Sequence, residues 1–206
     1  MRPLSTVIFE TERLYARDFV KEDAQDVFEY AGNLESSGFQ SFSPESYEDV
    51  VKFVESRLAE QLKEPRGFFD LVLCLKDTDE MVGAIGIYLD ADRRQAELGY
   101  NLKKRFWHNG YATEAAKGFL RFGFLGLDLH RITARCDDMN AASYRVMERI
   151  GMRREAHFIK AEYTTVFGRK GWRSTYHYAI LQKEYLNSLE DGDYSPDGRK
   201  TDAESD

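Results

Sequence analysis

A basic segment with a single glycine is the part of the sequence best suited to chemistry. It runs from Lys103 to Gly110 and leads into the small residues Ala112 and Thr113 at the expected start of a helix. The first N–H groups of a helix have no partners within it, and the helix dipole adds partial positive charge there. Such a helix start binds phosphate groups, so this segment is a candidate phosphate site. A plain strand-to-helix connection with a surface charge cluster is the alternative interpretation.

Hydrophobic periodicity predicts the elements that position this segment. We expect strands at 11–17, 68–75, 81–89, 96–102, 131–136, 153–160 and 174–182, and helices at 18–32, 44–62, 112–124 and 140–150. Residues 161–173 are expected to join the last two strands. Ser43 is expected to cap the second helix, with Pro44 in its first turn. This order predicts an α/β fold with a central mixed sheet of seven strands flanked by about four helices.

Length and charge predict one domain with a tail. The chain has 206 residues, of which 42% are hydrophobic and 14% aromatic, as in globular proteins. We expect the domain to span residues 1–187 and an acidic, disordered tail to span 188–206. The tail carries −5 of the net charge of −7, so the domain is close to neutral. A near-neutral domain argues against nucleic acid as the main partner, although a nucleic-acid patch at 103–105 stays a minor alternative.

Other classes of site find little support in the sequence. The two cysteines, Cys74 and Cys136, lie in apolar runs and are expected to be buried thiols. The four histidines lack metal-ligand spacing, so we expect no metal. The chain has no apolar run of the roughly 20 residues that span a bilayer and no secretory signal at its start. We therefore expect a cytoplasmic protein with no membrane partner.

Three ordered motifs resemble those of the GNAT superfamily of N-acetyltransferases. Trp107-His-Asn-Gly-Tyr-Ala112 is similar to its acyl-CoA-binding motif, and Gly110-Tyr-Ala-Thr-Glu-Ala115 matches the form usual in the branch of the RimJ and RimL ribosomal-protein acetyltransferases. Thr11-Glu-Arg-Leu14 resembles the opening strand of that branch. Asn140 to Met152 resembles its Asn-x-x-Ser helix, with Met in place of the final Phe. The resemblance covers roughly residues 9–185.

The resemblance implies a GNAT-like fold, acetyl-CoA as co-substrate and an amine as acceptor. The cofactor-binding residues that it implies are Leu102, His108, Asn109, Gly110, Tyr111, Ala112, Thr113 and Asn140. The backbone of Leu102 would pair with the pantetheine arm, residues 108–113 would hold the pyrophosphate, and Asn140 would bond the pantetheine or phosphate region. Ser143 would protonate or steady the departing thiolate, because Met147 stands where other members carry a tyrosine.

A general base is expected because the acceptor must attack as a neutral amine. Deprotonating a lysine amine at pH 7 costs roughly 4.6 kcal/mol, whereas an α-amine costs only about 1 kcal/mol. Glu97, at the start of the strand that passes the thioester, is the candidate base. The alternative is that Glu97 is an ordinary exposed carboxylate. Lesser candidates for the base are Glu155, His157 and Tyr176.

The predicted function is transfer of an acetyl group to a primary amine, on a protein N-terminus or a small molecule. The competing hypothesis is an acetyl-CoA-binding or sensing module without catalysis, which the Met at 147 and the Ser after Arg173 would suit. The acceptor is not readable from the sequence. Its pocket is expected to be shaped by the segments 18–32, 43–62 and 161–173, and a homodimer is left open.

Overall fold

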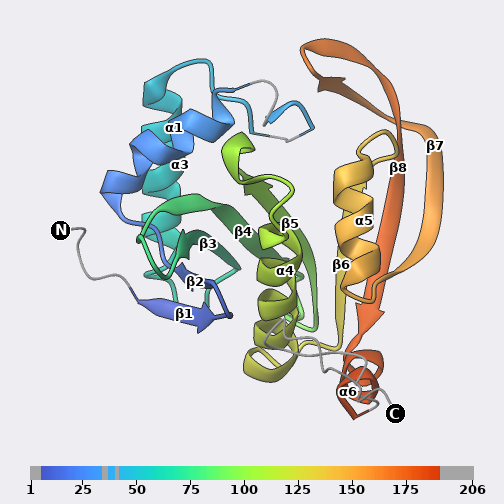
Figure 1. Ribbon diagram of the computed structural model, residues 1–206. Helices are drawn as coiled ribbons and strands as arrows, with labels where there is room; N and C mark the ends of the chain where they lie inside the picture. Colours follow the sequence, from blue (N-terminus) through green and yellow to red (C-terminus); the bar gives the residue numbers. More distant parts are fainter. Residues whose placement is uncertain (1–5, 34–36, 40–41, 191–206) are drawn as a thin grey trace, which may run out of the picture.

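The computed structural model describes residues 6–33, 37–39 and 42–190. Its centre is a mixed sheet of eight strands in the order β1-β2-β3-β4-β5-β6-β8-β7 (Figure 1). The strands are β1 (Val7–Glu10), β2 (Leu14–Arg17), β3 (Phe68–Leu75), β4 (Met81–Leu89), β5 (Gln95–Leu102), β6 (Arg131–Asp137), β7 (Arg153–Val166) and β8 (Arg169–Leu181). All neighbours are antiparallel except β5 and β6, which are parallel. The mixed α/β fold predicted from the order of elements is confirmed.

Helices cover both faces of the sheet. The α-helices within the described residues are α1 (Ala24–Ala31), α3 (Tyr47–Glu60), α4 (Tyr111–Arg121), α5 (Ala141–Arg149) and α6 (Gln182–Glu190). Single 3₁₀ turns form η1 (Lys21–Asp23) and η2 (Lys104–Phe106), and a π-helical turn, η3 (Phe122–Gly126), continues α4. Figure 1 shows α1 and α3 beside β3 and β4, and α4 next to α5.

Each face has its own hydrophobic core. Alternate residues of the strands point to opposite faces, so Leu71 and Leu73 pack with Phe119 of α4, whereas Val72 and Cys74 pack beneath α1 and α3. The sheet is therefore the middle of three layers. This arrangement assigns every side chain of β5 and β6 to the α4–α5 side or to the α1–α3 side.

The predicted sheet was one strand short. The segment expected to form a single strand at 11–17 turns at Thr11, whose N–H donates to the carbonyl of Leu14 at 2.8 Å. Residues before the turn pair as β1 with β2. The Thr11 hydroxyl also accepts from Leu14 N–H at 3.1 Å, so a hydroxyl side chain closes a turn that hydrophobic periodicity does not reveal.

The segment 161–173, expected to be a connection, is also strand. It completes β7 and β8, which meet at a two-residue turn with positive φ at Phe167 (49°) and Gly168 (71°). Tyr163-Thr-Thr-Val166 has high β propensity, and positive φ at both central residues suits a hairpin turn. The tip reaches residues 37–39, where Phe167 N–H donates to the carbonyl of Gly38 at 3.1 Å.

Several helix ends differ from the predictions. The helix expected at 18–32 begins as α1 only at Ala24, after the single turn η1. Ser46, not Ser43, caps α3, and Ser46 and Asp49 satisfy each other's backbone N–H groups as a capping box. Helix α6 was not expected and extends to Glu190, so the expected domain boundary at 187 falls within it. The rest of the expected tail, residues 191–206, lies outside the described residues.

Candidate active site

The start of α4 is built to receive an anion. Gly110 precedes the helix with φ of +80°, a left-handed conformation that glycine adopts at little cost. The first helical hydrogen bond is from Glu114 N–H to the Gly110 carbonyl, at 3.0 Å, and no side chain caps the helix. The N–H groups of residues 111–113 are thus available to an anion. His108, with φ of 62°, helps to bend the loop.

A buried carboxylate fixes this loop to the turn between β1 and β2. Glu114 is 8% exposed and accepts hydrogen bonds from the Thr11 hydroxyl at 2.6 Å and from the Arg13 N–H at 2.7 Å. Its second oxygen accepts from the Arg13 side chain at 2.7 Å. Two of the segments that carried the family resemblance are therefore in direct contact.

Arg13 places a positive charge at the same loop. Its guanidinium donates to the carbonyl of Asn109 at 3.1 Å and lies 4.5 Å from the ring centroid of Tyr111. A Cβ atom on Gly110 would lie 3.4 Å from Arg13 Nη2. Sequence reasoning missed this residue, because its distance along the chain from the loop hides the contact.

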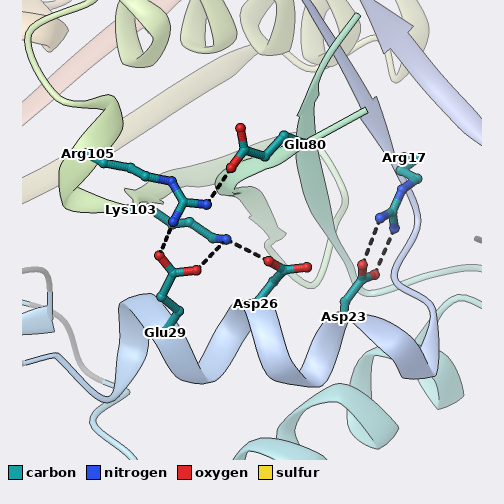
Figure 2. Close-up of polar contacts among 7 residues, drawn as sticks. All are labelled: Arg17, Asp23, Asp26, Glu29, Glu80, Lys103 and Arg105. Atoms are coloured by element: carbon teal, nitrogen blue, oxygen red, sulfur yellow. Dashed lines mark hydrogen bonds and ion pairs between the residues drawn. The ribbon is translucent and has the colours of Figure 1, made fainter. Parts of the chain in front are cut away.

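The sequence-predicted cations of the loop lie elsewhere. Lys103 is 1% exposed and bonds Asp26 and Glu29 of α1, at 2.6 and 2.7 Å (Figure 2). Arg105 pairs with Glu29 and with Glu80 of the β3–β4 turn, both at 2.5 Å. These two cations bind the loop to α1 and are neutralised there, so the basic residues of the segment do not add free positive charge at the start of α4. The same ion pairs neutralise most of the positive charge that binding of nucleic acid at residues 103–105 would need.

Strands β5 and β6 part beside this loop. They pair only from Gln95 to Glu97, opposite Arg131 to Thr133, although both strands continue. Leu102 ends β5 close to the loop, and its carbonyl accepts the indole N–H of Trp107 at 2.9 Å. One lone pair of the Leu102 carbonyl remains for a ligand. The expected path of the pantetheine arm, in the wedge between the strands, therefore has a main-chain hydrogen-bond acceptor along it.

Ser143 and Asn140 lie at the start of α5, on the far side of this wedge. Asn140 caps the helix, its side-chain oxygen accepting the Ser143 N–H at 3.2 Å. The half-buried Ser143 hydroxyl lies 3.1 Å from the hydroxyl of Tyr100, which also donates to the Ser143 carbonyl at 3.0 Å. Burial raises the pKa of Tyr100, so its phenol stays protonated. Sequence reasoning found Ser143 and missed Tyr100, although alternation along β5 points it toward α5.

Glu97 lies on the opposite face of β5. Its carboxylate accepts from Arg135 Nε at 2.9 Å, and Arg135 also bonds Glu162 at 3.2 Å. These two carboxylates raise the pKa of Arg135. The lesser candidates for the base are engaged outside the cavity described next: Glu155 with Arg131 and Arg153, His157 with Asp138, and Tyr176 beneath Arg154.

A cavity of about 340 Å³ opens on the Glu97 side of the wedge. Its walls include Tyr30 of α1, Phe53 of α3 and Thr165 of the β7–β8 hairpin, so all three segments expected to shape an acceptor pocket contribute. Tyr100 and Cys136 line it as well, which connects it with the Ser143 side. In the described part of the chain, no group of three or more His, Cys, Asp or Glu side chains is arranged to hold a metal ion.

Comparison with known proteins decides the family. The sequence model of the acetyltransferase (GNAT) domain family matches residues 13–153, which is more than half of the chain. The chain belongs to the GNAT acetyltransferase family. The sequence-based prediction of an N-acetyltransferase is thus confirmed at this level.

This GNAT protein is similar to its relatives over nearly their whole length. It is 35% identical over 178 residues to the uncharacterized N-acetyltransferase YnaD of Bacillus subtilis, covering 85% of this chain and 97% of the relative. A GNAT-family acetyltransferase structure from Bacillus anthracis is 32% identical, with a TM-score of 0.75, over 85% of this chain and 99% of that one.

A more distant structure shares the fold alone. Spermidine N-acetyltransferase from Vibrio cholerae, in complex with CoA and spermine, has a TM-score of 0.73 at 18% identity, over 85% of this chain and 99% of that one.

No α-helix within the described residues is long and apolar enough to span a membrane.

Proposed function

We propose that this GNAT protein transfers the acetyl group of acetyl-CoA directly to a primary amine while both substrates are bound. The observation that supports this most is the uncapped start of α4, with left-handed Gly110, beside the parted strands β5 and β6. The diphosphate would lie on residues 108–113, with Arg13 as an added cation. The pantetheine arm would then follow Leu102 into the wedge, with Asn140 and Ser143 on its other side.

The transfer needs one proton removed and one supplied. A neutral amine attacks the thioester carbon, a C–N bond forms, the C–S bond breaks, and the sulfur leaves as a thiolate that takes a proton. Ser143 and Tyr100, 3.1 Å apart through their hydroxyls, are placed to donate a hydrogen bond to that sulfur. Glu97 lies on the cavity wall, held by Arg135, and can accept the proton that the amine nitrogen loses.

The state of Cys136 supports direct transfer over an acetyl-cysteine intermediate. This thiol lines the cavity, and burial raises its pKa to about 11. Only the thiolate is an effective nucleophile, so at neutral pH Cys136 stays a protonated wall residue. Holding both reactants together then supplies the main advantage over solution.

The free-energy cost of deprotonating the amine at pH 7 indicates the class of acceptor. An α-amine, which costs only about 1 kcal/mol to deprotonate at pH 7, suits a site whose one candidate base is engaged by Arg135. A protein N-terminus or a small amine therefore fits better than a lysine side chain. The Gly110–Ala115 motif further supports placement near the RimJ and RimL branch.

Thiol release during acetyl transfer tests this function. Release should depend on both acetyl-CoA and an amine, and it should fall at least tenfold in Ser143→Ala and in Glu97→Gln. Calorimetry on Glu97→Gln should show unchanged binding of CoA, because Glu97 lies on the opposite face of β5 from the proposed path of CoA. CoA binding without thiol release from any amine would favour the silent, sensing alternative. Absence of CoA binding would remove the proposal altogether.

A further inference from the structure

One wall of the cavity carries three buried polar atoms that have no hydrogen-bond partner within the described residues. They are Oδ2 of Asp137, Nε of Arg173 and Oγ1 of Thr175. All three residues line the cavity, and Thr175 is only 5% exposed. A buried polar group left unsatisfied costs roughly 1–3 kcal/mol. Three such atoms on one wall of a cavity indicate a ligand that satisfies them.

These side chains lie together on the face of the sheet that carries Glu97. Asp137 of β6 and Thr175 of β8 are direct cross-strand partners, and Arg173 lies two residues before Thr175. Residues two apart on a strand share a face about 6–7 Å apart. Thr133 is the parallel partner of Glu97, and Asp137 lies four residues beyond Thr133, so Asp137 also faces this side.

The charges of the cavity wall single out the same residues. Its lining has four acidic and three basic side chains, a net charge of −1. Arg57 pairs with Asp70, and Arg135 pairs with Glu97 and Glu162. That leaves Asp137 and Arg173, each without an ion pair to any described residue. The wall therefore presents one acceptor charge and one donor charge, with a hydroxyl between them.

We propose that Asp137, Thr175 and Arg173 bind an α-aminoacyl group, which is an amine with a carbonyl oxygen on the next carbon. The inference rests on the proposed acetyl transfer and names its acceptor class. Asp137 Oδ2 accepts a hydrogen bond from the amine as the substrate binds. Arg173 Nε–H donates to the carbonyl or carboxylate oxygen, and the Thr175 hydroxyl bonds either group. The N-terminal residue of a peptide and a free amino acid both carry this group.

The same charge balance disfavours polyamines. A triamine brings three positive charges, whereas the net charge of the cavity lining is −1, and Arg173 would face the chain of methylenes and amines with no acceptor for its N–H. The cavity is also at the small end of ligand pockets, which suits one residue and the start of a second.

Initial rates of thiol release with four acceptors test the assignment: alaninamide, alanine, propylamine and spermidine. We expect kcat/KM for alaninamide or alanine to exceed that for propylamine about tenfold or more. Propylamine lacks the oxygen that Arg173 would bond, and its amine costs more to deprotonate at pH 7. The ratio of kcat/KM for alanine to that for alaninamide shows whether the acceptor is a free amino acid or a peptide-like amine. Spermidine or propylamine as the better substrate would overturn the inference and leave acetyl transfer intact.

Three variants assign the roles within the subsite. Arg173→Met should raise KM for alaninamide about tenfold and leave that for propylamine unchanged, and Arg173→Lys, which keeps the charge but has no N–H at that position, should do the same. Asp137→Asn should raise KM for both amines. Equal effects of Arg173→Met on both acceptors would refute recognition of the oxygen.

The matched control is Asp138→Asn. Asp138 is the next residue along the chain, does not line the cavity and bonds His157 at 3.0 Å. It should leave KM for every amine unchanged. All variants should keep the wild-type Tm within about 3 °C and the wild-type KM for acetyl-CoA. If no amine gives thiol release although CoA binds, the proposed function itself has failed, which differs from a changed order among amines.

Discussion

Glu114 and Arg13 join the start of α4 to the turn between β1 and β2. The Arg13 side chain lies 2.7 Å from Glu114 Oε2 through both Nε and Nη2, and its backbone N–H donates to Oε1 at 2.7 Å. Glu114 is buried and half of Arg13 is exposed. The start of α4, where we propose that the diphosphate binds, is thus held by a segment about 100 residues earlier in the chain.

Glu114→Gln is therefore expected to cost about 1–3 kcal/mol of stability and to weaken CoA binding, since Arg13 loses the partner that keeps it beside Asn109. Thermal unfolding and calorimetry measure the two effects. Glu12→Gln is the matched control, because Glu12 is exposed and adjacent in sequence, and it should change neither. Unaltered CoA affinity in Glu114→Gln would contradict a role for this pair in shaping the loop.

Gly110→Ala is expected to lower stability by about 1–2 kcal/mol, because φ of +80° strains any residue with a Cβ. It should also weaken CoA binding, since the new methyl group lies against Arg13. Gly168→Ala separates the effects: φ is +71° there, and nothing lies within 4 Å of its Cβ position. It should lose similar stability and keep full CoA affinity in calorimetry. Equal loss of CoA affinity in both variants would contradict the assignment of Gly110 to the diphosphate site.

Tyr100→Phe should lower kcat about tenfold or more while KM for both substrates changes little. The phenol donates to the Ser143 carbonyl and contacts its hydroxyl, so its loss leaves Ser143 free to rotate away from the departing sulfur. A double-mutant cycle with Ser143→Ala tests this reason. The two changes should be strongly non-additive in kcat, whereas additive effects would mean that Tyr100 and Ser143 act independently.

Lys103→Met should destabilise the protein by about 1–3 kcal/mol, because it removes the buried partner of Asp26 and Glu29, whose carboxylates are only partly exposed. The exposed pair Lys52–Glu48 provides the comparison: Lys52→Met should cost no more than about 1 kcal/mol. Chemical denaturation gives both values. Comparable small losses would show that the contact between the loop and α1 contributes little.

Acid should weaken the fold partly through Glu155. Hydrogen bonds and the charges of Arg131 and Arg153 lower its pKa from 4.5 to about 2. A carboxyl with a lowered folded-state pKa stabilises the protein fully above the unfolded value and loses that contribution as the pH falls through the folded value. Glu155→Gln should therefore flatten the fall in stability between pH 4.5 and about 2. Denaturation curves across that range check it, and an unchanged slope would exclude Glu155 as a contributor.

The residues around Gly110 and Ser143 could be found from the sequence because local pattern and local structure coincide there. A glycine before small residues marks a helix start, and resemblance to the Asn-x-x-Ser helix of the family points to Asn140 and Ser143. Arg13, Tyr100 and Lys103 could not be found in this way. Their partners lie between about 43 and 101 residues away, and the pairing of β1 with β2 depends on the hydroxyl of one threonine.

The long hairpin was missed for a related reason. Its polar residues, such as Thr164 and Lys170, are exposed along β7 and β8, so hydrophobic alternation is weak although β propensity is high. The acceptor wall that includes Arg173 therefore becomes visible only when the strands are placed beside β6.

The two reactants are assigned to opposite faces of one sheet. Acetyl-CoA would approach from the α4–α5 side and the amine from the α1–α3 side, with the parted strands as the only contact between them. Neither substrate would block the entrance of the other, so binding should follow no compulsory order. Double-reciprocal plots should then intersect, and an unreactive amine analogue should inhibit noncompetitively against acetyl-CoA. Compulsory binding of acetyl-CoA first would make that inhibition uncompetitive.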